Sequence, residues 1–207
     1  MGLWVSKTSY LGEHIDLWYL GKKMHTLLIT FLLFHMQGYE TQSYKIIQSF
    51  NKIELRYYPS AMKVKVNSRA SGNRNFNALF QYISGNNSEA KKIAMTTPVY
   101  MKNSSETQTM EFVLPAHYTD RAPKPKGKGV SVYQSKPGYY AAIRYGGYSN
   151  SAKETRYKKQ LMDALILNGI DIIGEPMLLS YDAPYKFYNR KNEIMIQVKK
   201  ESYSDTK

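Results

Sequence analysis

Apolar and polar residues alternate with a period of two in several short segments of the chain. The alternation is clearest over residues 53–57 and 62–66, on either side of Pro59. This period is typical of β-strands with one buried face, so both segments are expected to be strands. Pro59 and Ser60 predict a bend or bulge between them. Further strands are expected at residues 93–101, 110–114, 130–133, 139–145, 177–181 and 194–198.

Two other segments carry apolar residues at intervals of three and four, which is typical of amphipathic helices. The first covers residues 76–83 and is expected to end at Gly85. The second begins near Ser151 and Glu154, whose spacing predicts a capping box, and is expected to stop at Gly169. Its apolar stripe consists of Tyr157, Leu161, Ala164 and Leu165.

The same order of elements occurs twice. Pro59 and Pro137 are 78 residues apart, and Gly85 and Gly169 are 84 residues apart. We interpret this as a pseudo-two-fold repeat of β-α-β-β units in an α+β protein. Two such units predict an antiparallel sheet, curved or closed, with two helices packed on it.

The first 38 residues differ from the rest. Lys22 and Lys23 precede the apolar run 27–34, which is too short to span a bilayer. This arrangement predicts a signal peptide over residues 1–38, with Met24 as an alternative true start, and hence export to the periplasm or the exterior. The alternative is a buried or membrane-surface helix, and a leader without function would leave the protein in the cytoplasm.

The net charge is +13, and the predicted leader contributes only +1, because it holds three lysines against two acidic residues. The remaining +12 lies on residues 39–207 and favours anionic partners. Residues 39–200 are expected to form one domain, with a polar tail over residues 201–207. The absence of cysteine excludes disulfides, thiolate metal sites and cysteine nucleophiles.

Histidines are few. Three of the four lie in the leader, and His117 stands alone in a predicted loop. The sequence shows no metal-ligand spacing, no nucleophile with a nearby base and no phosphate-binding glycine loop, so neither a protein-built metal site nor an enzyme is expected.

Four segments of the predicted domain, in this order, resemble the SOUL family, also called the heme-binding protein family. They are residues 53–59, residues 82–99, residues 146–149, and residues 181–185 with 190–194. The resemblance covers about residues 44–199. It implies a distorted antiparallel β-barrel with two packed helices, and binding of heme or a related tetrapyrrole at a shallow hydrophobic surface.

The resemblance also yields three candidate ligand contacts. Some heme-binding members carry a histidine directly after the arginine of the first motif, and this chain has Tyr57 there. Tyrosinate can ligate ferric heme iron; the alternative is an aromatic residue packed on a strand. Arg56 is a candidate for a ligand propionate, or else an exposed strand cation. Met95 is a candidate for apolar ligand contact, or else a core residue.

The leading hypothesis is therefore a non-enzymatic binder of heme or a similar anionic amphiphile, which is not an integral membrane protein once its leader is removed. The alternative is a basic interaction protein without cargo, which binds acidic lipid, polysaccharide or another macromolecule. Export would disfavour nucleic acid as that partner. A third hypothesis is an enzyme that acts on a tetrapyrrole.

Overall fold

A computed structural model of the chain describes residues 38–68, 72–103 and 107–200. The predicted signal peptide, apart from Gly38, and the predicted polar tail lie outside these residues. No helix among them is long and apolar enough to cross a membrane.

The described chain is α+β. Its first elements are β1 (Glu40–Thr41), β2 (Lys45–Phe50), β3 (Ile53–Tyr58), β4 (Met62–Ser68), α2 (Gly72–Ile83), β5 (Thr96–Thr97), β6 (Val99–Asn103) and β7 (Gln108–Val113). They are followed by β8 (Val130–Gln134), β9 (Gly138–Gly146), α3 (Ser151–Leu167), β10 (Met177–Ser180) and β11 (Lys191–Val198). Two helices and predominantly antiparallel strands confirm the predicted fold class.

Nine strands form one antiparallel sheet in the order β2-β3-β9-β11-β10-β6-β7-β4-β8. The short strands β1 and β5 pair separately and in parallel. Among the described residues no register joins β2 to β8, so closure into a barrel stays a prediction.

Apart from β2, two strands of the sheet precede each helix and two follow it, which gives β3-β4-α2-β6-β7 and then β8-β9-α3-β10-β11. Position by position, the strand order of one half mirrors that of the other about the β6–β10 pair. That the two halves superimpose by a two-fold rotation remains a prediction.

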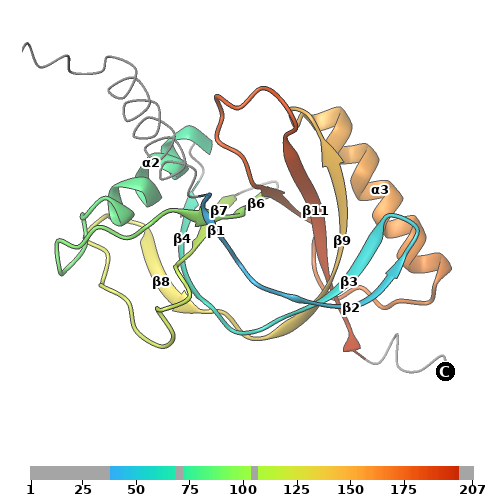
Figure 1. Ribbon diagram of the computed structural model, residues 1–207, viewed down its shortest axis with the longest axis horizontal. Helices are drawn as coiled ribbons and strands as arrows, with labels where there is room; N and C mark the ends of the chain where they lie inside the picture. The colour runs from blue at the N-terminus through green and yellow to red at the C-terminus, as the bar shows by residue number, and fades with distance from the viewer. Residues whose placement is uncertain (1–37, 69–71, 104–106, 201–207) are drawn as a thin grey trace, which may run out of the picture. The chain divides into compact units, whose positions relative to one another are not determined.

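The helices each cover part of the sheet (Figure 1), α2 against β4 and β7, α3 against β9 and β11. Leu161 and Leu165 of α3 are fully buried on Ile53 and Leu55 of β3 and their neighbours. A second cluster joins α2 to β4 and β7 in the same way. Because side chains alternate along a strand, the opposite face is left for a third cluster, which contains Tyr58, Tyr100, Val113, Ala142, Leu179 and Met195.

The predicted bend at Pro59 carries the chain from one part of the sheet to another. β3 ends just before Pro59 and pairs with β2 and β9, whereas β4 pairs with β7 and β8. The predicted strand 93–101 is shorter than expected, since Ile93 donates its amide to Ile83 at the end of α2. The cis peptide bond between Thr97 and Pro98 separates β5 from β6.

The predicted capping box of α3 is wrong. Asn150 is the N-cap, and its side-chain oxygen accepts a hydrogen bond from the Lys153 amide at 2.9 Å. Glu154 instead accepts from the Ser149 hydroxyl at 2.9 Å. The predicted stop is confirmed, because α3 ends at Leu167 and Gly169 follows with φ +64°.

Candidate functional site

The three candidate residues from the sequence do not lie together. Tyr57 is half-buried on the face covered by α3, with its ring centroid 5.1 Å from that of Tyr139. Met95 packs against the cluster beneath α2. Arg56 points to the opposite face of the sheet from its neighbour Tyr57, as the alternation of a strand requires.

Arg56 is neither an exposed cation nor available for a ligand carboxylate. It is 1% exposed, and its guanidinium forms two hydrogen bonds to Glu193, of 2.7 and 3.0 Å. A third bond of 2.8 Å goes from Nε to Glu54, and a fourth of 3.2 Å to the Tyr58 hydroxyl. The prediction that Arg56 pairs with a propionate is therefore corrected, because internal carboxylates already engage the guanidinium.

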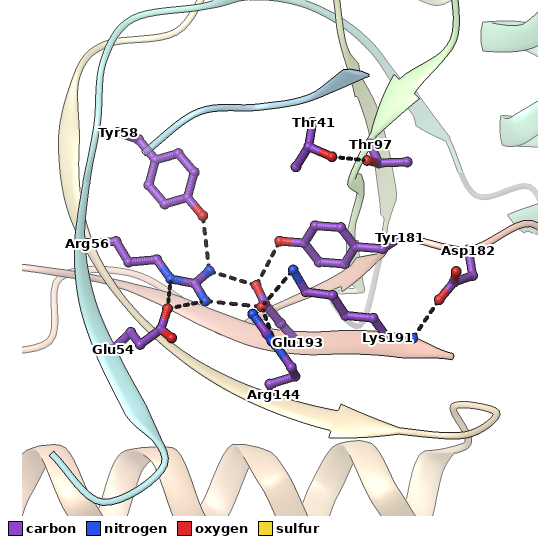
Figure 2. A network of polar contacts seen from close by, with 10 residues as sticks. All are labelled: Thr41, Glu54, Arg56, Tyr58, Thr97, Arg144, Tyr181, Asp182, Lys191 and Glu193. Carbon is purple, nitrogen blue, oxygen red and sulfur yellow. Dashed lines mark hydrogen bonds and ion pairs between the residues drawn. The ribbon is translucent and has the colours of Figure 1, made fainter. Parts of the chain in front are cut away.

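Glu193 is the centre of this buried network (Figure 2) and is 0% exposed. The Tyr181 hydroxyl donates to it at 2.8 Å, and Arg144 and Lys191 lie within 3.5 Å. Burial alone would raise the pKa of Glu193, but the hydrogen bonds and charge of Arg56, aided by Lys191 and Tyr181, lower it to about 2. The network stays ionised near neutral pH and joins β3 and β9 to β11.

The network continues into the loop between β10 and β11 through Tyr181 and Lys191. The carboxylate of Asp182 accepts the Lys191 amide at 2.5 Å and pairs with Lys186. Although burial opposes it, hydrogen bonding from Lys186 and Lys191 lowers the pKa of Asp182. Arg190 donates to the carbonyls of Ala183 and Lys186 at 2.7 Å each. These bonds fix both ends of the loop.

The fixed loop presents aromatic side chains to solvent. Tyr185, Phe187 and Tyr188 are 80%, 78% and 65% exposed, respectively. Together with Tyr39 they surround a hollow of about 350 Å³, also lined by Tyr181, Asp182, Ala183 and Lys186. We call this hollow the aromatic loop site. Contiguous exposed apolar surface of this kind marks interaction sites.

A second hollow of about 390 Å³ lies on the sheet face opposite the helices, and we call it the inner pocket. Its aromatic walls are Tyr58, Tyr100, Tyr133 and Tyr140, and its charged lining residues are Lys63, Lys102, Lys136 and Glu111. It shares no lining residue with the aromatic loop site.

The sequence singled out residues 181–185 and 190–194, but the exposed aromatic residues of the loop were not among the predicted ligand contacts. The cluster Tyr185, Phe187 and Tyr188 in a loop beside Lys186 was a visible signal, since solvent-exposed loops seldom carry three aromatics in four residues. Within the described residues, no group of three or more His, Cys, Asp or Glu side chains converges as a metal site would require.

A sequence model of the SOUL heme-binding protein family matches residues 39–197. Heme-binding protein 1 of Xenopus laevis is 26% identical over 126 residues, and that of Xenopus tropicalis is 25% identical. Each alignment covers 56% of this chain and 65% of the relative, so the chain spans just under two thirds of the length of these curated relatives.

Solved structures share the fold at low sequence identity. An uncharacterized conserved protein from Listeria innocua has a TM-score of 0.54 at 10% identity, covering 72% of this chain and 92% of that one. A structure titled as a hydrolase from Listeria innocua has a TM-score of 0.53 at 12% identity, covering 74% and 94%. At such identities the likeness concerns the fold alone.

Proposed function

Since the chain belongs to the SOUL heme-binding protein family, which matches residues 39–197, we propose that it binds heme or a related planar, amphipathic tetrapyrrole without transforming it. The aromatic loop site is the observation that supports a location for the ligand on this chain. Its rings are exposed. The loop that bears them is held by the Lys191 amide, which donates to Asp182, and by Arg190, which donates to the Ala183 carbonyl.

The lining of the aromatic loop site fits the chemistry of a tetrapyrrole. Flat apolar faces can stack on Tyr185, Phe187 and Tyr188. The nearby Lys186 ammonium already pairs with Asp182, so a propionate would compete with that carboxylate for it. The tyrosine hydroxyls can supply a tyrosinate to ferric iron, an axial ligand that heme proteins use. Hydrogen bonding to Tyr185 raises the pKa of Tyr39, so the Tyr39 hydroxyl keeps its proton and serves better as a donor than as that ligand.

The exposed area of one aromatic ring gives the binding free energy that covering this ring would contribute. An aromatic side chain offers roughly 150–250 Å² for burial, and Phe187 is 78% exposed before a ligand covers it. At about 25 cal/mol per Å², covering half of that surface contributes about 2 kcal/mol. Loss of one ring should therefore weaken binding by roughly tenfold or more.

A hemin titration of the full chain tests the proposal, with the Soret band as readout. We expect saturable one-to-one binding that Phe187→Ala and Tyr188→Ala each weaken about tenfold. Phe80→Ala is the matched control, because Phe80 is a partly exposed aromatic on α2 that lines neither hollow. Absence of any saturable shift in the unaltered chain would overturn the proposal.

The sequence-based ligand Tyr57 is tested in the same titration. Because its ring packs beside that of Tyr139 and lines neither hollow, Tyr57→Phe is expected to leave the Soret shift unchanged. A shift lost in Tyr57→Phe would instead assign the iron to Tyr57 and contradict the aromatic loop site. Steady consumption of hemin by the chain in the presence of a reductant would revive the hypothesis of an enzyme.

One observation also favours the alternative of a cargo-free interaction protein. Three exposed aromatics with Lys186 on a fixed loop suit insertion at the interface of an acidic membrane, which the charge of +12 on residues 39–207 would attract. Sedimentation with phosphatidylserine vesicles, compared with phosphatidylcholine vesicles, tests this. Binding only to the former, lost at high salt and indifferent to hemin, would favour the alternative.

Export of the protein and closure of its sheet into a barrel are two further proposals. Export by residues 1–38 is tested by fusing that segment to a reporter that is active only outside the cytoplasm. Closure of the nine-stranded sheet into a distorted barrel is tested by amide hydrogen exchange, since closure would protect the outer edges of β2 and β8 and an open sheet would not.

A further inference from the structure

We propose that the inner pocket is a second ligand site, separate from the aromatic loop site, which takes a small planar aromatic carboxylate. Its position on the sheet face opposite the helices and its lining, rather than the family, carry this inference. It goes beyond the binding of a tetrapyrrole, and neither proposal depends on the other.

The walls of the inner pocket suit a flat aromatic body. Four tyrosines from β3, β6, β8 and β9 meet there, with Tyr58 and Tyr140 in an edge-to-face contact at 5.5 Å between ring centroids. The methionines Met101, Met177 and Met195 complete the apolar lining and adapt readily to planar ligands. A volume of about 390 Å³ is near the lower end of the roughly 300–1,000 Å³ typical of ligand pockets, which suits one or two fused rings.

The charge of the lining favours an anion. Three lysines and one glutamate line the pocket. Lys63 is buried, with Nζ 3.4 Å from Glu111 and 3.6 Å above the Tyr100 ring. Lys102 pairs with Glu175, which lies outside the lining, and Lys136 has no ion-pair partner within residues 38–68, 72–103 and 107–200. The lining therefore keeps an excess of positive charge.

Nearby buried charges do not reverse this balance. Beside the pocket, Arg56 donates to the hydroxyl of the lining residue Tyr58. Together with Arg144 and Lys191, Arg56 faces Glu54 and Glu193 in the network described above, so the cations are again in excess. Burial lowers the pKa of Lys63, and the Glu111 carboxylate opposes that effect. A ligand carboxylate would stabilise the Lys63 ammonium further, in a place where water cannot do so.

A free donor is also present. The Tyr140 hydroxyl, half-buried in the pocket, has no hydrogen-bond partner in the described part of the chain. Burial and then the Glu111 carboxylate raise the pKa of Tyr140, so the hydroxyl keeps its proton. Lys63 and Tyr140 thus offer a carboxylate one charged and one neutral donor at the wall of an otherwise apolar pocket.

Three isosteric probes test the charge of the ligand: naphthalene carboxylate, naphthalene carboxamide and naphthylmethylammonium. Calorimetric titration of the full chain is expected to show saturable binding of the carboxylate, about tenfold tighter than that of the carboxamide, as one charge-assisted hydrogen bond implies. Tighter binding of the ammonium probe, or no saturable binding of the carboxylate, would overturn the proposal.

The variants are chosen so that misfolding cannot imitate the expected result. Glu111→Gln removes the carboxylate that competes for Lys63 and is expected to tighten binding of the carboxylate probe several-fold. Lys63→Met should weaken it about tenfold. Lys158→Met, which alters a lysine on α3 outside the pocket lining, should leave it unchanged. Weaker binding in Glu111→Gln would contradict an anion site.

Two further measurements separate this site from the aromatic loop site. Lys136→Gln, an exposed rim substitution, should weaken carboxylate binding two- to threefold at low salt and little at high salt. Phe187→Ala, which lies outside the pocket, should leave carboxylate binding unchanged while it weakens hemin binding. Loss of carboxylate binding in Phe187→Ala would show that the probe occupies the other hollow and would overturn the inference.

Discussion

The buried pair of Arg56 and Glu193 makes a sharp prediction about stability. Glu193→Gln keeps the shape of the side chain but leaves the Arg56 guanidinium without its bidentate carboxylate, in a site that excludes water. Breaking a buried ion pair by removing one partner typically costs about 3–5 kcal/mol. Glu54 still contacts Arg56 at 2.7 Å, so the lower end of that range is expected.

The lowered pKa of Glu193 gives a second value for the contribution of this ion pair to the free energy of unfolding, and the two values agree. One pKa unit corresponds to about 1.4 kcal/mol, so a carboxyl displaced from 4.5 to about 2 contributes about 3 kcal/mol to folding. Because the pKa is lowered in the folded state, this contribution is present above pH 4.5 and is lost as the pH falls toward 2. About 2 kcal/mol of it should already be lost at pH 3.

Urea unfolding followed by circular dichroism, at pH 7 and at pH 3, measures both effects. We expect Glu193→Gln to lower the free energy of unfolding by about 3 kcal/mol at pH 7 and by only about 1 kcal/mol at pH 3. Glu54→Gln is the control, with an expected loss below about 1 kcal/mol, since its carboxylate is partly exposed. A loss at pH 7 under about 1 kcal/mol for Glu193→Gln, or one equal at both pH values, would refute the reasoning.

Two further predictions concern α3. Asn150→Ala should lower the free energy of unfolding by about 1 kcal/mol, because the Lys153 amide loses its acceptor. Ser151→Ala should change the melting temperature little. A larger loss in Ser151→Ala than in Asn150→Ala would restore Ser151 as the cap. Leu161→Ala should lower the free energy of unfolding in guanidinium by about 3 kcal/mol, because Leu161 is fully buried. Leu167→Ala, at the exposed end of the helix, should be neutral. Similar losses for both variants would contradict the packing described.

Much of the fold could be predicted because its strands have one buried face. Residues 53–57 and 62–66 alternate in the sequence and form β3 and β4 in the structure. β2 gave no such signal, since five of its six residues are exposed and it pairs with β3 across a bulge near Ile47. The cap of α3 was displaced by one residue because Asn150 and Ser151 are both good caps, and only the backbone geometry selects between them.

The site was harder to predict because its contacts are distant in sequence. Arg56 and Glu193 are separated by 137 residues, and a lone arginine in a strand does not indicate which carboxylate it meets. The alternation did show that Arg56 and Tyr57 could not contact one ligand together, because adjacent residues of a strand point to opposite faces of the sheet. The inner pocket could not be predicted, because its walls come from strands of both halves.

The strand order means that each half of the chain pairs one strand that precedes its helix with the other half. β3 pairs with β9 of the second half, while β8 pairs with β4 of the first. This reciprocal exchange resembles a domain swap within one molecule. A fragment cut between β7 and β8 would lack a strand that its own sheet requires, so neither fragment should fold alone, and the two together should reassemble by complementation.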